Sequence, residues 1–189
     1  MNVLRNAPVL VPACATAQGV NAAWRAALVA RDLGVALRLL QLAPHLAPVS
    51  AQMCSLQRLA LEIKAHLGID VELTHATEHA LAATVRAARE AALVVIGPRP
   101  GNPLRQLVLG TQAEQLIRLC RVPVLVVKRP ATASYRRVLV PVELTPAARP
   151  VIATAARLSR SAGGGAARAG RRGRSRAAPA RPVTGAGAA

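Results

Sequence analysis

The sequence has very few aromatic residues, with no Phe, one Trp and one Tyr among 189 residues. A core without aromatic side chains has to be built from Leu, Val, Ile and Ala, as it usually is in parallel α/β sheets. Apolar runs of the length needed to span a membrane are absent as well, which argues against a membrane partner. The length is sufficient for one domain of ordinary size with residues to spare.

A cysteine pattern is also missing. Cys14, Cys54 and Cys120 are spaced too widely for a zinc site or a CxxC motif. An odd number of cysteines without a clear export signal predicts reduced thiols and a cytoplasmic protein. Residues 11–14 resemble a lipoprotein cleavage box, but the apolar stretch before them is too short for a signal peptide. Cys54 and Cys120 fall in predicted helices, where we expect them to pack.

Acidic residues are absent from the C-terminal part of the chain. The formal net charge is +17, all eight acids lie at or before Glu143, and residues 163–189 hold six arginines. Hydrophobic periodicity is lost after Leu158, so we expect residues 163–189 to be disordered. Without aromatics between its arginines, this tail predicts nonspecific anion binding and no specific nucleic-acid recognition. We also hypothesise that a frameshift in a GC-rich gene produced it.

What is present is an alternation of strands and helices. Short Val- and Ile-rich runs predict strands at residues 9–13, 35–42, 69–75, 93–96 and 122–127. Helical spacing predicts helices at residues 18–32, 51–67 and 78–90, and one opening at Gly110 and Thr111. Five such steps predict an α/β fold, an open parallel five-stranded sheet with helices on both faces. The third strand alternates apolar and polar residues and belongs at an edge, which gives the Rossmann-like order 3-2-1-4-5.

This order predicts a ligand site between the first and fourth strands. The loops after Ala13 and Ile96 both open at the point where the strand order reverses. Gly97, Gly110 and Thr111 lie in a strand–loop–helix segment whose backbone amides and helix N-terminus suit a phosphate. The alternative interpretation is that these glycines only turn the chain.

The sequence gives little support for a metal site or for catalysis. His75 and His79 lack a third ligand, so we predict no metal. No nucleophile, base and acid occur at a recognisable spacing, so we predict no catalytic residues. Cys14 at the end of the first strand is interpreted either as a redox-sensing thiol or as a small buried side chain.

The first strand and helix are repeated later in the chain. Residues 137–145 parallel residues 8–16 at a spacing of 129, and a helix is predicted at residues 146–160. The predicted organisation is therefore a domain at residues 1–130, the start of a second repeat at 131–162, and the tail at 163–189.

The sequence resembles the universal stress protein (UspA-like) family. The resemblance rests on VLVP in the first strand, LRLLQL in the second, and VVIG with LVLGTQAEQLIRLCRVPVLVVK at the end. It covers residues 8–128 and the start of a tandem second domain at residues 136–160. It implies an adenine nucleotide alpha hydrolase-like fold, a regulatory role in stress response, an ATP-like ligand, and pairing through residues 122–127. Because the second domain is truncated, that strand is left open and we expect a homodimer or aggregation.

The resemblance also suggests a nucleotide site that has lost part of the family pattern. Gly97, Gly110 and Thr111 match the family loop G-x2-G-x9-G-(S/T), but Pro100 replaces its second glycine. Cys14 stands where members that bind ATP tend to carry aspartate. The implied cofactor-binding residues are Pro12, Cys14, Leu42, Gly97, Arg99, Gly101, Gly110, Thr111 and Gln112. Pro98, Pro100 and Pro103 each remove a donor amide from the loop. A ligand-free interaction module is therefore the alternative, while an ATP-hydrolysing enzyme lacks a carboxylate in the loop.

Overall fold

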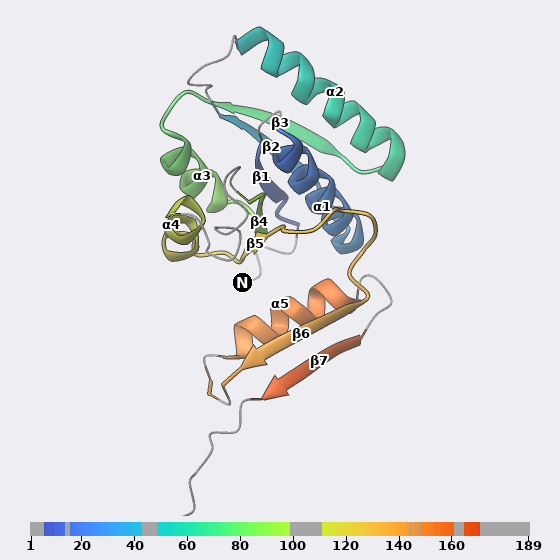
Figure 1. Cartoon of the computed structure of the whole chain (residues 1–189), viewed down its shortest axis with the longest axis vertical. Helices are drawn as coiled ribbons and strands as arrows, with labels where there is room; N and C mark the ends of the chain where they lie inside the picture. The colour runs from blue at the N-terminus through green and yellow to red at the C-terminus, as the bar shows by residue number, and fades with distance from the viewer. Residues whose placement is uncertain are drawn as a thin grey trace, which may run out of the picture.

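The computed structural model describes residues 6–13, 16–42, 49–98, 111–143, 145–146, 148–160 and 165–170. The elements follow one another as β1 (Val9–Ala13), α1 (Ala17–Leu33), β2 (Leu37–Leu42), α2 (Val49–Leu67), β3 (Val71–Ala76), α3 (Ala80–Ala88), β4 (Leu93–Ile96), α4 (Thr111–Leu119), β5 (Val124–Val126), β6 (Arg137–Val142), α5 (Ala148–Arg160) and β7 (Gly165–Gly170) (Figure 1).

The first five strands form one parallel sheet in the order β3-β2-β1-β4-β5. This confirms the predicted fold class and strand order, including the edge position of β3. Each strand returns to the next through a helix, as parallel pairing requires. The four helices α1 to α4 cover both faces of the sheet (Figure 1).

The alternation of side chains along each strand divides the core into two layers. Val9 and Val11 face α1 and α2, where they pack with Leu37 and Ile63. Leu10 faces the opposite side and packs with the residues of β4 and α3. The central strands are thus apolar on both faces, which explains their unbroken hydrophobic runs.

Helix α1 has well-defined ends. The Thr16 hydroxyl accepts a hydrogen bond from the Gly19 amide at 3.1 Å and caps the first turn. At the other end Gly34 adopts a left-handed conformation with φ 66°, which ends the helix at little steric cost. Alanines fill much of its surface, so the helix packs closely between neighbours on several sides.

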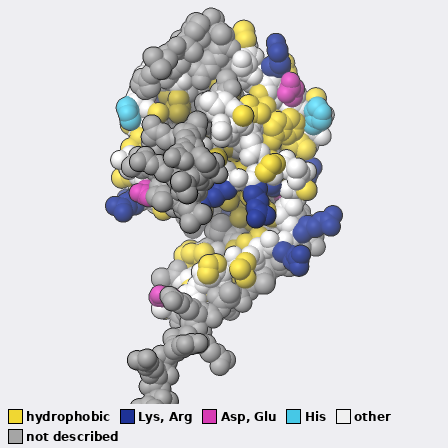
Figure 2. All heavy atoms as spheres, in the orientation of Figure 1, with side chains coloured by type: hydrophobic (Ala, Val, Ile, Leu, Met, Phe, Trp, Pro, Cys, Tyr) yellow, Lys and Arg dark blue, Asp and Glu magenta, His cyan; other side chains and the backbone are white. Residues whose placement is uncertain are grey.

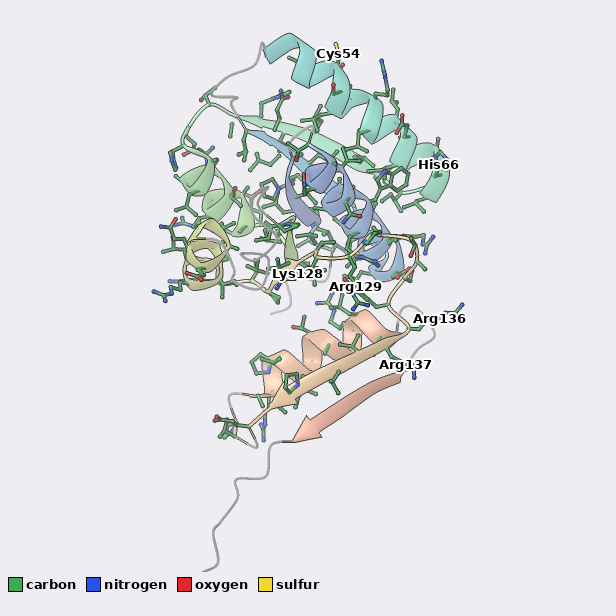
Figure 3. The ribbon with its side chains drawn as sticks, viewed as in Figure 1. Cys54, His66, Lys128, Arg129, Arg136 and Arg137 are labelled. Atoms are coloured by element: carbon green, nitrogen blue, oxygen red, sulfur yellow. The ribbon has the colours of Figure 1, made fainter. Side chains whose placement is uncertain are left out.

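The segment that leaves β5 runs along α1. Asn21 accepts a hydrogen bond from the Ala131 amide at 2.8 Å and donates one to the Arg129 carbonyl at 3.0 Å. Further along the helix, Arg31 donates to the Ser134 hydroxyl at 2.9 Å. Figure 3 shows Lys128 and Arg129 at the start of this linker and Arg136 and Arg137 at its end.

The linker leads to a second, smaller unit, β6–α5–β7. Strands β6 and β7 pair in parallel as a separate two-stranded sheet. The register is that of the first repeat, because partners lie 28 residues apart both in Val9↔Leu37 and in Arg137↔Gly165. Val140 and Val142 of β6 pack against Ala155 of α5 in a small core.

Strand β7 corrects one expectation. Residues 163–189 were predicted to lack regular structure, yet residues 165–170 form this strand. The segment has no hydrophobic period, but strand pairing uses backbone groups, which every residue of the segment supplies. The rest of the predicted tail, from residue 171, lies outside the described residues.

Two further details concern helices α1 and α2. Trp24 is half-buried against the larger core cluster, with its ring edge-on to His66 at 5.7 Å between ring centres. Cys54 was expected to pack, but it is exposed on α2, so that prediction was wrong. None of the helices in the described ranges has the length and hydropathy needed to cross a bilayer.

Candidate functional site at the carboxyl edge of the sheet

The carboxyl ends of the strands lie in one row across the sheet. The register pairs Ala13 of β1 with Gln41 of β2, and Gln41 with His75 of β3. On the other side of β1, Leu10 pairs with Val94. Continuing this register by three residues places Gly97, directly after β4, beside Ala13. The loops that follow β1 and β4 therefore leave the sheet side by side, as the sequence predicted.

Gly97 is in close contact with α1. A Cβ atom at this position would lie 2.7 Å from the Gln18 carbonyl oxygen and 3.1 Å from its carbonyl carbon. Both distances are shorter than ordinary van der Waals contact, and both atoms belong to the backbone. Glycine at this position is therefore required by the packing of β4 against the first turn of α1, whether or not a ligand binds.

Pro12 limits how far β1 and β4 pair. Val9 donates its amide to the Ala36 carbonyl beside β2, so the alternate residues Leu10 and Pro12 turn their backbone groups towards β4. Proline has no N–H to donate, and the pairing of β1 with β4 ends at Leu10. The two strands therefore lie side by side but are no longer paired at their carboxyl ends, where a ligand would enter.

The first turn of α1 adds a favourable field for anions. It begins at Ala17, four residues after β1 ends at Ala13, so its amide groups lie at the carboxyl edge of the sheet. Helix N-termini carry partial positive charge and attract phosphate or carboxylate groups. Thr16 satisfies one of these amides, that of Gly19, within the protein.

Gln41 is a polar residue in the row that the sequence analysis overlooked. Its side chain is buried, and its Oε1 atom has no hydrogen-bond partner among the residues that the structure describes. A buried acceptor without a donor is costly, so such groups in native proteins call for an explanation. The sequence signal was the single uncharged polar residue in the strand LRLLQL. A ligand group that donates a hydrogen bond would satisfy it.

The predicted cofactor-binding residues are only partly within the described ranges. Pro12, Leu42 and Gly97 lie at or next to the carboxyl ends of β1, β2 and β4, on one edge of the sheet. Thr111 and Gln112 open α4, but their side chains are outside the described residues. The same holds for the whole of Cys14, Arg99, Gly101 and Gly110, and for Pro100.

The chemistry of the remaining groups is limited. Among the described residues, no group of three or more His, Cys, Asp or Glu side chains is arranged to hold a metal ion. Burial raises the pKa of the Cys120 thiol, which keeps it protonated and weakly reactive. The edge is thus equipped with backbone amides, a helix N-terminus and one buried amide acceptor, which suits binding of a polar ligand.

Comparison with known proteins identifies the family of this chain. Residues 6–128 match the model of the universal stress protein family. No curated protein is a significant match at the level of sequence. Solved structures of the same fold are numerous, and the three described next are less than 25% identical to this chain, so they show the fold alone.

Three of these structures illustrate how far the likeness extends. A universal stress protein from Archaeoglobus fulgidus shares 23% identity and a TM-score of 0.53, covering 65% of this chain and 98% of its own. A universal stress protein in complex with cAMP shares 22% identity and a TM-score of 0.52, covering 65% and 97%. A longer universal stress protein from Archaeoglobus fulgidus DSM 4304 shares 15% identity and a TM-score of 0.62, covering 93% of this chain and 71% of its own.

Proposed function

This chain belongs to the universal stress protein family, and we propose that it is a cytoplasmic regulatory protein of stress response that binds a nucleotide. The ligand would be ATP-like, or a related phosphate compound, held between the carboxyl ends of β1 and β4. The observation that carries the proposal is the convergence of three features at one edge: the unpaired carboxyl ends of β1 and β4, the first turn of α1, and the Gln41 amide oxygen without a partner among the described residues.

Two lines of argument support a nucleotide in this place. Open parallel sheets bind ligands where the strand order reverses, and here that point lies between β1 and β4. A protein with the same fold is described in complex with cAMP, an adenine nucleotide. Two further predicted contacts, Pro12 and Leu42, lie at or next to the carboxyl ends of β1 and β2 on the same edge.

The alternative is a dimerisation or interaction module that binds no nucleotide. It is favoured by the loop sequence, in which Pro100 replaces a glycine and three prolines remove amide donors. Catalysis is not part of the proposal, because residues 97–112 contain no Asp or Glu to act as base or to hold Mg²⁺. Binding, rather than hydrolysis, is the proposed activity.

A calorimetric titration of the full chain with ATP–Mg²⁺ tests the proposal. Binding with a dissociation constant in the micromolar range is the expected result, with AMP as a second ligand to measure the contribution of the outer phosphates. No heat of binding with either nucleotide at about millimolar concentration would instead favour the interaction module. Release of inorganic phosphate from ATP would overturn the assignment as a non-enzyme.

Replacing Gln41 gives a more specific result. Gln41→Leu removes a buried acceptor without a partner, so we expect the free energy of unfolding to rise by about 1 kcal/mol. If the amide contacts the ligand, nucleotide affinity falls by about threefold to tenfold at the same time. Chemical denaturation and calorimetry on the same samples measure the two effects separately.

Thr74→Val is the matched control for this experiment. The Thr74 hydroxyl is also buried and has no hydrogen-bond partner in the described part of the chain, but Thr74 pairs with Leu40, whose side chain faces the opposite layer of the core. We expect this variant to gain stability without changing nucleotide affinity. Equal affinity of the Gln41 variant and the control would remove Gln41 from the site.

We also propose that the second unit is the truncated start of a tandem repeat. Strand β6, α5 and β7 reproduce β1, α1 and β2 with the same 28-residue register. The longer Archaeoglobus fulgidus protein matches 93% of this chain, so its likeness extends past the first domain. Domain boundaries at residues 1–130 and from 131 onward follow from this proposal.

Self-association through the last strand of the main sheet is the proposed partnership. Strand β5, within the predicted segment 122–127, pairs only with β4 among the described strands. The Val94 amide donates to the Pro123 carbonyl and the Val127 amide donates to the Ile96 carbonyl. The alternate residues Val124 and Val126 therefore turn their backbone groups to the open edge, where a second copy would pair.

Val124→Pro tests this edge because it removes an outward N–H and leaves the bonds to β4 in place. In a symmetric dimer the hydrogen bond from this N–H is lost twice. We therefore expect the dissociation constant of the dimer to rise by about tenfold or more. Val124→Ala is the matched control, since it shortens the side chain but keeps the N–H. Sedimentation velocity between about 1 and 100 μM covers the relevant range; association of the proline variant as strong as that of the control would refute pairing through β5.

A further inference from the structure

The second unit exposes an edge and a face that are covered in the first. In the main sheet, β1 is flanked by β2 and β4, and Leu10 is fully buried. In the repeat, β6 has β7 on one side and no described strand on the other. Leu139, which corresponds to Leu10, is 70% exposed. Strand β6 therefore carries an exposed apolar residue beside an edge with which no described strand pairs.

The exposed face of β6 has a distinct charge pattern. Arg137, Leu139, Pro141 and Glu143 are all exposed and alternate with residues that face α5. The row begins with a positive residue and ends with a negative one. Within the described part of the chain, neither Arg137 nor Glu143 has an ion-pair partner.

This pattern is complementary to itself when the strand is reversed. We propose that β6 pairs antiparallel with β6 of a second copy, centred on Val140. Arg137 of each copy would then lie opposite Glu143 of the other, twice across the two-fold axis, and Leu139 would lie opposite Pro141. The result is a four-stranded sheet, β7-β6-β6-β7, with both copies of α5 on one face.

The hydrogen bonding of the edge is compatible with this register. Pro141 lies within the ladder of β6 with β7 but has no N–H to donate, so its backbone groups and those of the alternate residue Leu139 turn away from β7 and towards the open edge. Pro141 cannot donate, as is typical of edge strands, but its carbonyl accepts from the Leu139 amide of the other copy. A slip of the pairing by two residues would separate the charges, so the Arg137–Glu143 pairs select one register.

The occupant is a second copy rather than another protein because one chain supplies both halves of the charge pattern. This interface is separate from the proposed β5 edge and independent of nucleotide binding. If both edges are used, association continues beyond a dimer, because two different two-fold contacts on one chain build an open assembly.

A charge-exchange experiment tests the register. Arg137→Glu and Glu143→Arg each place like charges opposite one another at two sites, and we expect each to raise the dissociation constant by about tenfold. The double variant R137E/E143R restores opposite charges and is expected to associate within about threefold of the parent. Sedimentation of all four proteins in the V124P background isolates this contact, and the same set in the wild-type background guards against misfolding of V124P.

Circular dichroism should show equal folding of the four proteins, since both residues are exposed. Rescue by the double variant would come only from direct proximity of the two positions across the interface. A parent that stays monomeric in both backgrounds, single variants that associate as strongly as the parent, or a double variant without rescue would each overturn the proposal.

Discussion

Gly97→Ala is expected to lower the free energy of unfolding by about 2–3 kcal/mol, the cost of overpacking a site whose neighbours cannot move easily. The new methyl group would lie 2.7 Å from the Gln18 carbonyl oxygen. Because that atom belongs to the backbone of α1, no side-chain rotation relieves the contact, and the first turn of the helix has to shift away from β4. Urea denaturation followed by circular dichroism measures the loss.

The comparison with Gly34→Ala separates steric contact from backbone strain. Gly34 has φ 66°, and a Cβ atom added there would meet no other atom within 4 Å, whereas Gly97 has a close contact and needs no left-handed backbone. The Gly34 variant should lose about 1 kcal/mol, the usual cost of a left-handed non-glycine residue. A Gly97 variant as stable as wild type would show that α1 is not held against β4 as described.

Gly97→Ala also bears on the nucleotide proposal. The same displacement would move the amides of the first turn of α1, so any ligand held there should bind more weakly. A large loss of stability with unchanged nucleotide affinity would mean that the glycine serves packing only, and that the phosphate groups lie away from the first turn of α1.

The fold was readable from the sequence because its strands are short, apolar and separated by regular helices. Strands β1 and β4 begin and end where the hydrophobic runs do, and β3 stands at the edge as its alternation predicted. Strand β7 was not predictable, since its residues form no hydrophobic pattern and its pairing depends on the neighbouring edge of β6. Local sequence carries little information on such a strand.

The site was harder to predict than the fold. The alternation of strands and helices located the edge, but the role of Gly97 depends on a contact with Gln18, far away in sequence. Gln41 was overlooked because a polar residue in an apolar strand can point into either layer or pair locally. Its importance follows only from its burial and from the missing partner of Oε1.

Arg25 is the other residue whose role the sequence concealed, and it joins the two parts of the chain. It lies on α1, with only 6% of its surface exposed. Its guanidinium donates to the carbonyl of Ala133 at 2.5 Å and to that of Pro130 at 3.3 Å. The ring of Tyr135 covers it, with the guanidinium carbon 4.4 Å from the ring centre. Two charge-assisted hydrogen bonds and a cation–π contact thus hold the linker on the helix.

Arg25→Met should release this linker. The substitution keeps much of the side-chain volume but leaves the two carbonyl groups without these donors. We expect it to lower the free energy of detaching the linker from α1 by about 3 kcal/mol. That value corresponds to roughly a hundredfold larger population of the detached linker. Figure 2 shows several basic side chains where the two parts of the chain meet. Two of the basic residues, Lys128 and Arg136, are exposed and lie at the two ends of the linker, where trypsin can cleave. Cleavage at these residues should accelerate by a similar factor while the main sheet stays folded.

Arg31→Met is the matched control, because it also removes one arginine of α1 that contacts the linker. Arg31 is 42% exposed in its side chain and donates to the Ser134 hydroxyl and to Asp32. Exposed contacts of this kind contribute up to about 1 kcal/mol, so its cleavage rate should rise by about fivefold or less. Timed trypsin digestion with mass spectrometry of the fragments measures both rates. Equal rates for the two variants would mean that burial of Arg25 adds nothing, and that the linker is held on α1 by its hydrogen bonds to Asn21.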